Sequence, residues 1–340
     1  MKILNIMLSR DLGGIQQAFL DYNTALEMQN IEVINVTSYK AKINSFISSN
    51  FKIPNLLSFD LISVLVLKYI IYKTKPDIIV AHGNRAINFS KLAKTPKTKL
   101  IGIAHNYSIK ALRRCDFVIA LTHHMKEHLL KNNFSKSKIF ILPNMINITK
   151  TFIPNKAYKK PIVIGVLARF VAKKGVDVFI NAVKILQDKN YEIQAIIGGN
   201  GEEQDNLTAL VDKLNLQDKI LFTGWISDKD KFFEQIDIFC LPSLHEPFGI
   251  ILLEAMENSL PIVSTNTEGP SEILKHMQDG LICKAGLSKD LAEKIAYLID
   301  NPQKAKELSQ KAYLKLTQTY NIKVISDKLV TLLHGLKIVS

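Results

Sequence analysis

Short runs of β-branched residues, alternating with amphipathic helical stretches, constrain the fold of this 340-residue chain more than any other feature. The runs carry apolar residues on both faces, which is typical of the buried strands of a parallel sheet that helices cover on each side. The first half of the chain therefore predicts an open α/β domain. Its runs span residues 2–8, 31–36, 77–82, 99–105, 116–121 and 138–143.

A second series of such runs follows at 161–168, 192–198, 219–224, 236–242, 260–265 and 280–284. The segment between the two series is rich in Lys and Pro and predicts a linker. We expect two Rossmann-like, doubly wound domains that face each other across a cleft, with ligands at the carboxyl ends of the strands. The expected bounds are 1–150, a linker over 151–160, 161–320, and a C-terminal helix over 321–340 that packs back on the first domain.

The longest apolar stretch, residues 56–72, contains Asp60 and Lys68 and falls short of the roughly 18 to 20 apolar residues that a membrane span needs. We expect a buried core helix there. The opening residues have no secretory-signal pattern, and the three cysteines are far apart without metal-site spacing, which suits a reducing cytoplasm. Asp228-Lys229-Asp230 has the letters of a DxD metal motif but reads better as a capped helix start. We therefore predict no metal site and no cofactor.

The charge is distributed unevenly along the chain. Residues 1–160 hold 24 Lys+Arg against 8 Asp+Glu, whereas the rest holds 20 against 23. A basic half attracts phosphate-rich surfaces such as nucleic acid or an anionic membrane, and charge alone does not separate the two. General solubility charge is the alternative, but a compositional bias would load both halves alike.

Two glutamates mark the segment HEPFGIILLEAMENSLPIVST, residues 245–265. Glu246 follows a buried strand and Glu254 lies eight residues later within a helix that Pro247 is placed to open. The N-terminal amides of this helix, from Phe248, Gly249 and Ile250, would present free donors to a diphosphate or sugar hydroxyls. Glu254 lies about 9 Å beyond Phe248 along the helix axis, which resembles the distance from a diphosphate to a ribose, and a carboxylate can accept both hydroxyls of the ribose diol. A surface role explains Glu254 poorly because its neighbours are apolar.

A second candidate region is the loop after the strand at 161–168. Arg169 and Lys174 lie on this loop, and a helix starts after Gly175. Two fixed cations at the carboxyl end of a strand would stabilise the negative charge that develops on a nucleoside-diphosphate leaving group. By itself the loop is an ordinary turn. Its place in the same domain as the two glutamates favours the functional interpretation.

Together these residues resemble family 4 of the glycosyltransferases, retaining enzymes of the GT-B fold, over nearly the whole chain. The matching patterns are E(x)7E at Glu246 and Glu254, and R(x)4KG at Arg169 and Lys174. The resemblance implies that Arg169 and Lys174 bind the donor diphosphate, that Glu254 binds the ribose and that Glu246 lies by the donor sugar. Weaker matches are the turn GGNGEE at 198–203, with Gly199, and EGPSEIL at 268–274, with Glu272 near the donor. Met145 departs from the pattern, since the segment ILPNMIN has Met where the family usually has Gly.

The resemblance adds candidates in the first domain. Gly13 and Gly14 lie between the first strand and the next helix, where glycines let backbone amides approach a phosphate or sugar. His105 ends a strand, and a family histidine at the equivalent place contacts the sugar, so we list it with Arg169, Lys174 and Glu246 as catalytic. His82 also ends a strand, with functional and structural interpretations balanced.

We therefore expect a metal-independent glycosyltransferase that moves a sugar from a nucleoside-diphosphate sugar to a glycan or lipid-linked acceptor, for example in lipopolysaccharide synthesis, with the anomeric configuration retained. The alternatives are a non-catalytic basic protein that binds nucleic acid or membrane, and a nucleotide-sugar epimerase of related fold. A pure binding module would not need the Glu, Arg and Lys set, so no nucleic-acid partner is expected. Basic residues accumulate around 91–114, close in sequence to His105, and an anionic leaflet would attract them. The resemblance implies acceptors at the inner face of the membrane, so we expect a cytoplasmic protein that attaches peripherally there.

Overall fold

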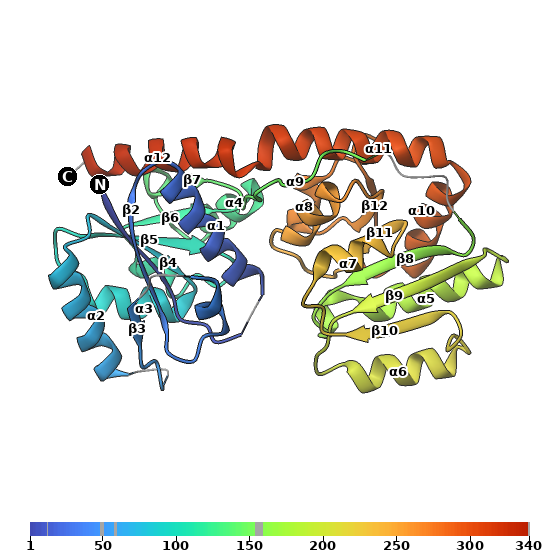
Figure 1. The fold of residues 1–340 in the computed structure, drawn as a ribbon, viewed down its shortest axis with the longest axis horizontal. Helices are drawn as coiled ribbons and strands as arrows, with labels where there is room; N and C mark the ends of the chain where they lie inside the picture. Colours follow the sequence, from blue (N-terminus) through green and yellow to red (C-terminus); the bar gives the residue numbers. More distant parts are fainter. Residues whose placement is uncertain (12, 48–50, 58–59, 154–158, 339–340) are drawn as a thin grey trace. The chain divides into compact units, whose positions relative to one another are not determined.

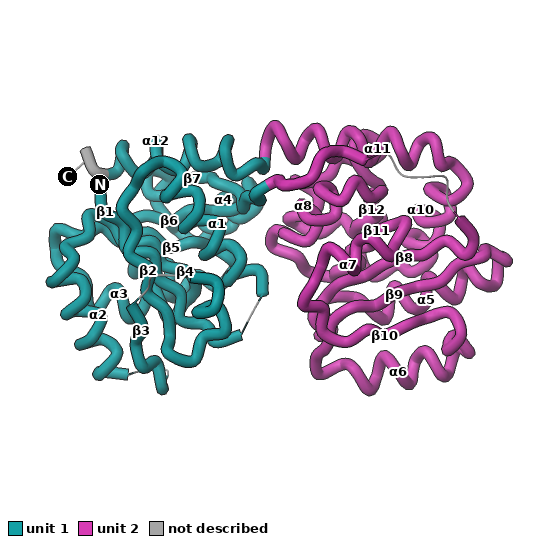
Figure 2. The backbone as a smooth tube through the Cα atoms, viewed as in Figure 1, with its two compact units in different colours: residues 1–147, 320–340 teal, residues 148–319 magenta. Residues whose placement is uncertain are grey.

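The computed structural model describes residues 1–338 except 12, 48–50, 58–59 and 154–158. The chain divides into two compact units, shown in separate colours in Figure 2. Unit 1 comprises residues 1–147 together with 320–340, and unit 2 comprises residues 148–319. The sequence predicts these boundaries at 150 and 320.

Unit 1 is built on a parallel sheet with the order β3-β2-β1-β4-β5-β6-β7 (Figure 1). The strands are β1 Lys2–Met7, β2 Glu32–Ser38, β3 Phe51–Ile53, β4 Ile78–His82, β5 Lys99–Ala104, β6 Phe117–Ala120 and β7 Ile139–Ile141. The helices are α1 Gly14–Met28, α2 Leu61–Thr74, α3 Asn84–Ala93, α4 His123–Lys131 and α12 Ile322–Ile338. All six predicted strands are present. The short edge strand β3 was missed, because two of its three side chains are exposed and carry no alternating pattern.

The C-terminal helix α12 is part of unit 1. Ile322, Ile325, Leu329 and Leu333 are fully buried. The Gln29 amide at the end of α1 donates hydrogen bonds to Ser326 Oγ (3.1 Å) and Asp327 Oδ1 (2.6 Å). A segment more than 290 residues away in the sequence therefore completes the fold of the first unit.

Unit 2 repeats the architecture with a parallel sheet in the order β10-β9-β8-β11-β12-β13. Its strands are β8 Ile162–Leu167, β9 Ile193–Gly198, β10 Ile220–Gly224, β11 Ile238–Leu241, β12 Ile262–Thr265 and β13 Leu281–Cys283. Its helices are α5 Val176–Asp188, α6 Gln204–Lys213, α7 Lys229–Glu234, α8 Ile250–Glu257, α9 Glu268–Ile273, α10 Ser288–Asp300 and α11 Pro302–Lys315. Each predicted strand is present, so the expectation of two doubly wound α/β domains is confirmed.

The prediction of a buried core helix at 56–72 is wrong for half of the helix surface. Helix α2 buries Val64, Leu67, Ile70 and Ile71 against the sheet, but other large apolar side chains of α2 face solvent. The sequence is apolar all round the helix, so periodicity did not separate the two faces. Among the described helices, none combines the length and the hydropathy needed to cross a membrane.

Candidate functional site

The predicted cations and glutamates of unit 2 lie where its strand order reverses. The chain adds β9 and β10 on one side of β8, then returns to add β11, β12 and β13 on the other. Strands β8 and β11 are therefore adjacent at the centre of the sheet, and the chain continues from them toward opposite edges. Open α/β sheets bind ligands at such a point. Arg169 follows β8, and Glu246 follows β11.

An ion pair joins the two sequence patterns at this point. Lys174 Nζ lies 2.5 Å from Glu246 Oε2, although 72 residues separate them. Glu246 is 8% exposed. The backbone brings the two loops together as well, because the N–H of Leu244 donates to the carbonyl of Lys173 at 2.8 Å. A buried carboxylate and a half-buried ammonium thus form one cluster at the ends of β8 and β11.

Gly175 makes this approach possible. It has φ +62°, and a Cβ at this position would lie 2.2 Å from the carbonyl oxygen of Pro242. Only glycine fits both the left-handed backbone and the close contact. The glycine after Lys174 is therefore a packing requirement of the R(x)4KG pattern.

Glu254 projects from α8 with one satisfied and one unsatisfied oxygen. Lys229 Nζ lies 2.6 Å from its Oε1. Its Oε2 is buried and has no hydrogen-bond partner within the described part of the chain. A buried carboxylate oxygen without a donor is costly, which suits an atom that receives its donors from a ligand. The sequence does not identify Lys229 as a site residue, because its neighbours predict only a capped helix start.

Helix α8 begins later than predicted. Its N-cap is Gly249, with φ +94°, so Pro247 precedes the helix and does not open it. The left-handed backbone at Gly249 sets the start. The orphan N–H groups of the first turn thus begin at Ile250, and of the three predicted amide donors only that of Ile250 lies within the helix. Phe248 is 4% exposed and packs closely on the backbone of Gly269.

A second carboxylate beside Glu246 was missed. Glu268 Oε1 lies 2.9 Å from Nδ1 of His245, and the N–H of Glu246 approaches Glu268 Oε2 at 3.4 Å. Burial alone would raise the pKa of the Glu268 carboxyl, but hydrogen bonds from its own N–H, His245 and the Glu246 N–H lower it overall. Glu272, the residue predicted for this loop, lies four residues later near the end of α9. The sequence offered two glutamates in one loop and no signal to choose between them.

Arg169 is exposed and, within the described residues, forms no ion pair. The Gly-rich turn after β9 supports its loop: Phe170 N–H donates to the carbonyl of Asn200 at 2.8 Å. Gly199, with φ +129°, leaves no room for a Cβ, which would collide with the carbonyl of Ala168. The turn therefore holds the cation-bearing loop in place.

Unit 1 has the same kind of reversal between β1 and β4. Gly13 and Gly14 lie at the start of α1 after β1; Gly13 has φ 168°, an extended conformation that any residue adopts. His82 ends β4 and His105 follows β5, and their rings meet: His82 Nδ1 lies 3.1 Å from His105 Nε2. The structure thus pairs the two histidines that the sequence treated separately. His123 and His124 begin α4 and are exposed.

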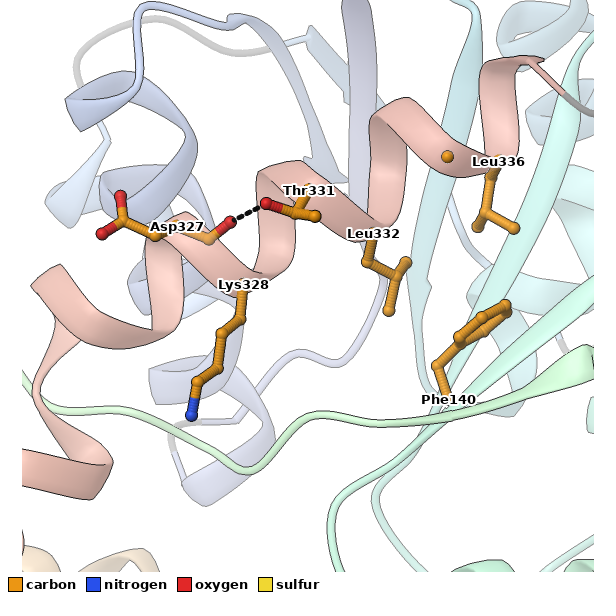
Figure 3. A pocket seen from close by; sticks show the side chains of 7 residues that line it. Phe140, Asp327, Lys328, Thr331, Leu332 and Leu336 are labelled. Carbon is orange, nitrogen blue, oxygen red and sulfur yellow. Dashed lines mark hydrogen bonds between the residues drawn. The ribbon is translucent and has the colours of Figure 1, made fainter.

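Two other features lie apart from these residues. Asp228 caps α7 by accepting the N–H of Lys231, so the helix-start interpretation of the DxD letters is confirmed. A surface groove of unit 1 runs along α12 and is lined by Phe140, Asp327, Lys328, Thr331, Leu332, Gly335 and Leu336 (Figure 3). It contains none of the predicted site residues.

Comparison with known proteins agrees with this geometry. Residues 147–315 match the group 1 glycosyl transferases, and residues 12–150 match glycosyltransferase family 4. The lipopolysaccharide core biosynthesis glycosyltransferase LpsE of Rhizobium meliloti (strain 1021) is 25% identical over 98% of this chain and 99% of its own length. Anabaena HepE, solved with UDP and glucose, superposes with a TM-score of 0.84 at 20% identity, covering 98% of this chain and all of HepE. Sucrose-phosphate synthase from Thermosynechococcus elongatus gives a TM-score of 0.85 at 17% identity, with both chains fully covered.

Two parallel α/β units, together with the matches to the glycosyltransferase families, identify the chain as a glycosyltransferase of the GT-B class. Within that class, the chain belongs to glycosyltransferase family 4, since the family 4 match and the group 1 match together extend from residue 12 to residue 315.

Proposed function

We propose that this glycosyltransferase uses a nucleoside-diphosphate sugar as donor and transfers the sugar with retention to an acceptor hydroxyl in the synthesis of a lipopolysaccharide or another cell-surface glycan. The observation that carries the proposal is the contact of Lys174 with Glu246 at the switch point of unit 2, beside the exposed cation of Arg169. The names of relatives support the pathway: LpsE acts in lipopolysaccharide core biosynthesis, and a relative in Staphylococcus aureus (strain COL) is a poly(ribitol-phosphate) alpha-N-acetylglucosaminyltransferase.

The proposed roles follow from charge and position. Arg169 and Lys174 stabilise the diphosphate as negative charge grows on it in the transition state, and the first-turn amides of α8 add neutral donors. Glu254 Oε2 accepts a ribose hydroxyl, which satisfies its missing hydrogen bond. Glu246 and His105 contact the transferred sugar. With no carboxylate assigned as a covalent nucleophile, the leaving phosphate oxygen accepts the proton of the incoming acceptor hydroxyl on the same face of the sugar.

The test is the affinity of the free enzyme for a nucleoside diphosphate or its sugar. Glu254→Ala should weaken binding about 10-fold to 150-fold, because a charge-assisted bond to a ribose hydroxyl is lost. Glu234→Ala, which removes an exposed carboxylate at the end of α7, is the matched control and should bind as the wild type does. Calorimetric titration measures both. Unchanged affinity in Glu254→Ala would remove the ribose assignment.

We also propose that unit 1 attaches the enzyme to the inner face of the membrane, where a lipid-linked acceptor would lie. Lys91, Lys97, Lys110 and Arg114 are exposed, whereas Lys94 is largely buried and bound to Asp116 at 3.0 Å. An anionic leaflet attracts each exposed cation by about 1 kcal/mol. Co-sedimentation with anionic liposomes should therefore weaken as salt rises. Equal binding to neutral liposomes, or none to anionic liposomes at low salt, would favour a soluble acceptor.

A further inference from the structure

Helix α2 carries an apolar face that no described residue of unit 1 covers. Leu61, Ile62, Leu65, Tyr69 and Tyr72 are each between 56% and 75% exposed. Leu56 and Leu57, just before the helix, are 59% and 68% exposed. Apolar side chains on a protein surface are ordinary when single, but a continuous set marks a contact surface.

The positions of these side chains form one stripe. At about 100° per residue they fall within an arc of roughly 100°, along about 16 Å of the helix axis. Lys68 and Lys73, both exposed, lie at the two borders of the stripe. The buried residues of α2 lie on the opposite side, so the stripe is a second apolar face and not an extension of the core.

The charged residues of α2 indicate what kind of partner binds the apolar stripe. Between Leu61 and Lys75 the sequence holds Lys68, Lys73 and Lys75 and no Asp or Glu. In a two-fold dimer the same patch would meet itself, which would bring lysines against lysines. An anionic bilayer accepts both parts at once: the apolar stripe enters the boundary of the acyl chains, while the lysine stems extend toward the phosphates.

We propose that the stripe of α2 is a membrane-inserting surface whose partner is an anionic lipid bilayer. The proposal deepens the membrane attachment proposed above by adding a hydrophobic component that salt does not screen. Asp60 stabilises the start of α2. Its carboxylate caps α2 through the Ser63 N–H (3.1 Å) and accepts the Leu56 N–H (2.9 Å), which holds the backbone at Leu56 next to the start of the helix.

The experiment measures partitioning onto vesicles of phosphatidylethanolamine with phosphatidylglycerol, at low and high salt. Leu65→Ser with Tyr69→Ser should lower partitioning about tenfold or more and abolish the fraction that resists salt. Lys68→Gln with Lys73→Gln should lower the salt-sensitive part, to which the cations around 91–114 also contribute, and leave the salt-resistant part unchanged. Leu314→Ser, at an exposed leucine of α11, is the matched control and should partition as the wild type does.

Two results would overturn the proposal. One is wild-type partitioning by the Leu65→Ser, Tyr69→Ser variant. The other is a wild-type dimer, seen by sedimentation, that this variant converts to monomers without any change in vesicle binding, because the partner would then be a second copy of the chain. Transfer to a water-soluble acceptor without vesicles should stay at the wild-type rate in all variants, so failure of the proposed activity would appear separately.

A different observation carries a second inference, about the histidine pair in unit 1. His82 is 2% exposed, and its ring lies edge-on to Phe19 and Tyr22 at centroid distances of 5.7 and 5.1 Å. Its Nδ1 meets His105 Nε2 at 3.1 Å, while its Nε2 has no partner among the described residues. His82 thus has one hydrogen bond, and that bond goes to the histidine assigned to the sugar.

A single proton must lie between the two rings. Burial lowers the pKa of His105 to about 4, and burial together with His105 lowers that of His82 well below its usual value. Both rings are therefore neutral at pH 7, and each holds one proton. The ring that donates the shared hydrogen bond carries its proton on the bonded nitrogen. The ring that accepts it must carry its own proton on its other nitrogen, so the tautomer of one histidine determines that of the other.

We infer that His82 is a positioning residue that fixes the ring orientation and tautomer of His105. This inference rests on the proposed contact of His105 with the sugar. His82→Leu removes the hydrogen bond, and His82→Asn keeps an amide near the Nδ1 position. Tyr22→Phe is the matched control, because Tyr22 also contacts the His82 ring and its buried hydroxyl has no hydrogen-bond partner among the described residues.

Nitrogen-15 NMR of the imidazole groups should show one His105 tautomer in the wild type and a mixture in His82→Leu. Turnover should fall roughly 10- to 100-fold in His82→Leu with an unchanged donor KM, recover partly in His82→Asn, and stay unchanged in Tyr22→Phe. An unaltered His105 tautomer in His82→Leu would overturn the inference. Wild-type turnover in His105→Ala would instead contradict the role proposed for His105 itself.

Discussion

At the scale of single residues, substitution of two glycines can show whether the site needs the close contact between Gly175 and the Pro242 backbone. Gly175 and Gly224 have nearly the same left-handed backbone, with φ +62° and +68°. They differ in surroundings: a Cβ at Gly175 would strike the Pro242 carbonyl, whereas a Cβ at Gly224 would meet nothing within 4 Å. Comparing the same substitution at both positions separates backbone strain from steric collision.

Gly224→Ala should lower the free energy of unfolding by about 1 to 2 kcal/mol, the cost of a side chain in the left-handed region. Gly175→Ala should cost about 1 to 3 kcal/mol more, because the loop must also move away from Pro242. That movement displaces Lys174, so turnover should fall in Gly175→Ala only. Denaturant unfolding and steady-state kinetics measure the two effects. Equal losses in both variants would show that the collision is relieved without cost.

The exposed cation of the site gives a second residue-scale prediction. Arg169→Ala should lower turnover more than it weakens donor binding, because the guanidinium acts on charge that develops in the transition state. Lys174→Ala should behave alike but also destabilise unit 2, since it leaves the buried Glu246 carboxylate unpaired. A rise in KM with unchanged kcat in Arg169→Ala would contradict this role.

At the scale of elements, the strand pattern predicted twelve of the thirteen described strands, because buried parallel strands are uniformly apolar. Glu246, Glu254, Arg169 and Lys174 were placed correctly at strand ends and in α8. The exposed face of α2 was not predictable, because burial depends on which neighbours cover an apolar helix. The hydrogen bond between Glu268 and His245 was equally unpredictable, because it depends on how α9 packs beside the loop that follows β11.

The paired histidines His82 and His105, at the ends of β4 and β5, predict that the free energy of unfolding depends on pH. Both histidines have a pKa below the unfolded value of 6.5, so the unfolded chain binds more protons below that pH. Their stabilising contribution is therefore complete above pH 6.5 and is lost as the pH falls toward 4, at up to about 1.4 kcal/mol per histidine per pH unit. Asp60 and Asp116, whose pKa values are lowered, titrate below this window.

Urea unfolding at pH 7, 6 and 5 measures this loss. The variant with both His82→Asn and His105→Asn should lose clearly less stability over the same range than the wild type. Parallel slopes for the two proteins would mean that other groups cause the pH dependence.

At the scale of the whole molecule, the two units differ in charge and carry separate cores. Unit 1 holds 23 Lys+Arg against 9 Asp+Glu, and unit 2 holds 21 against 22. The basic excess thus belongs almost entirely to the unit with the α2 stripe, while the nearly neutral unit carries the proposed donor site. Separate cores also mean that unfolding need not be a single two-state transition.

Nucleotide binding should therefore stabilise the units unequally. Scanning calorimetry with a nucleoside diphosphate at 100 times its dissociation constant should stabilise unit 2 by about 2.7 kcal/mol and raise its transition. The transition of unit 1 should move less, and Glu254→Ala should require a higher nucleotide concentration for the same shift. An equal rise of every transition would indicate that the units unfold as one.

The order of the elements along the chain has a consequence for biosynthesis. Unit 1 is complete only when α12 covers it, and α12 leaves the ribosome after all of unit 2. At 5 to 20 residues per second, the wait for the intervening segment lasts roughly 10 to 30 s. Throughout that interval the nascent first unit exposes the surface that later buries Ile322, Ile325, Leu329 and Leu333. Until α12 has been synthesised, the growing chain therefore exposes an apolar surface of the kind that chaperones bind.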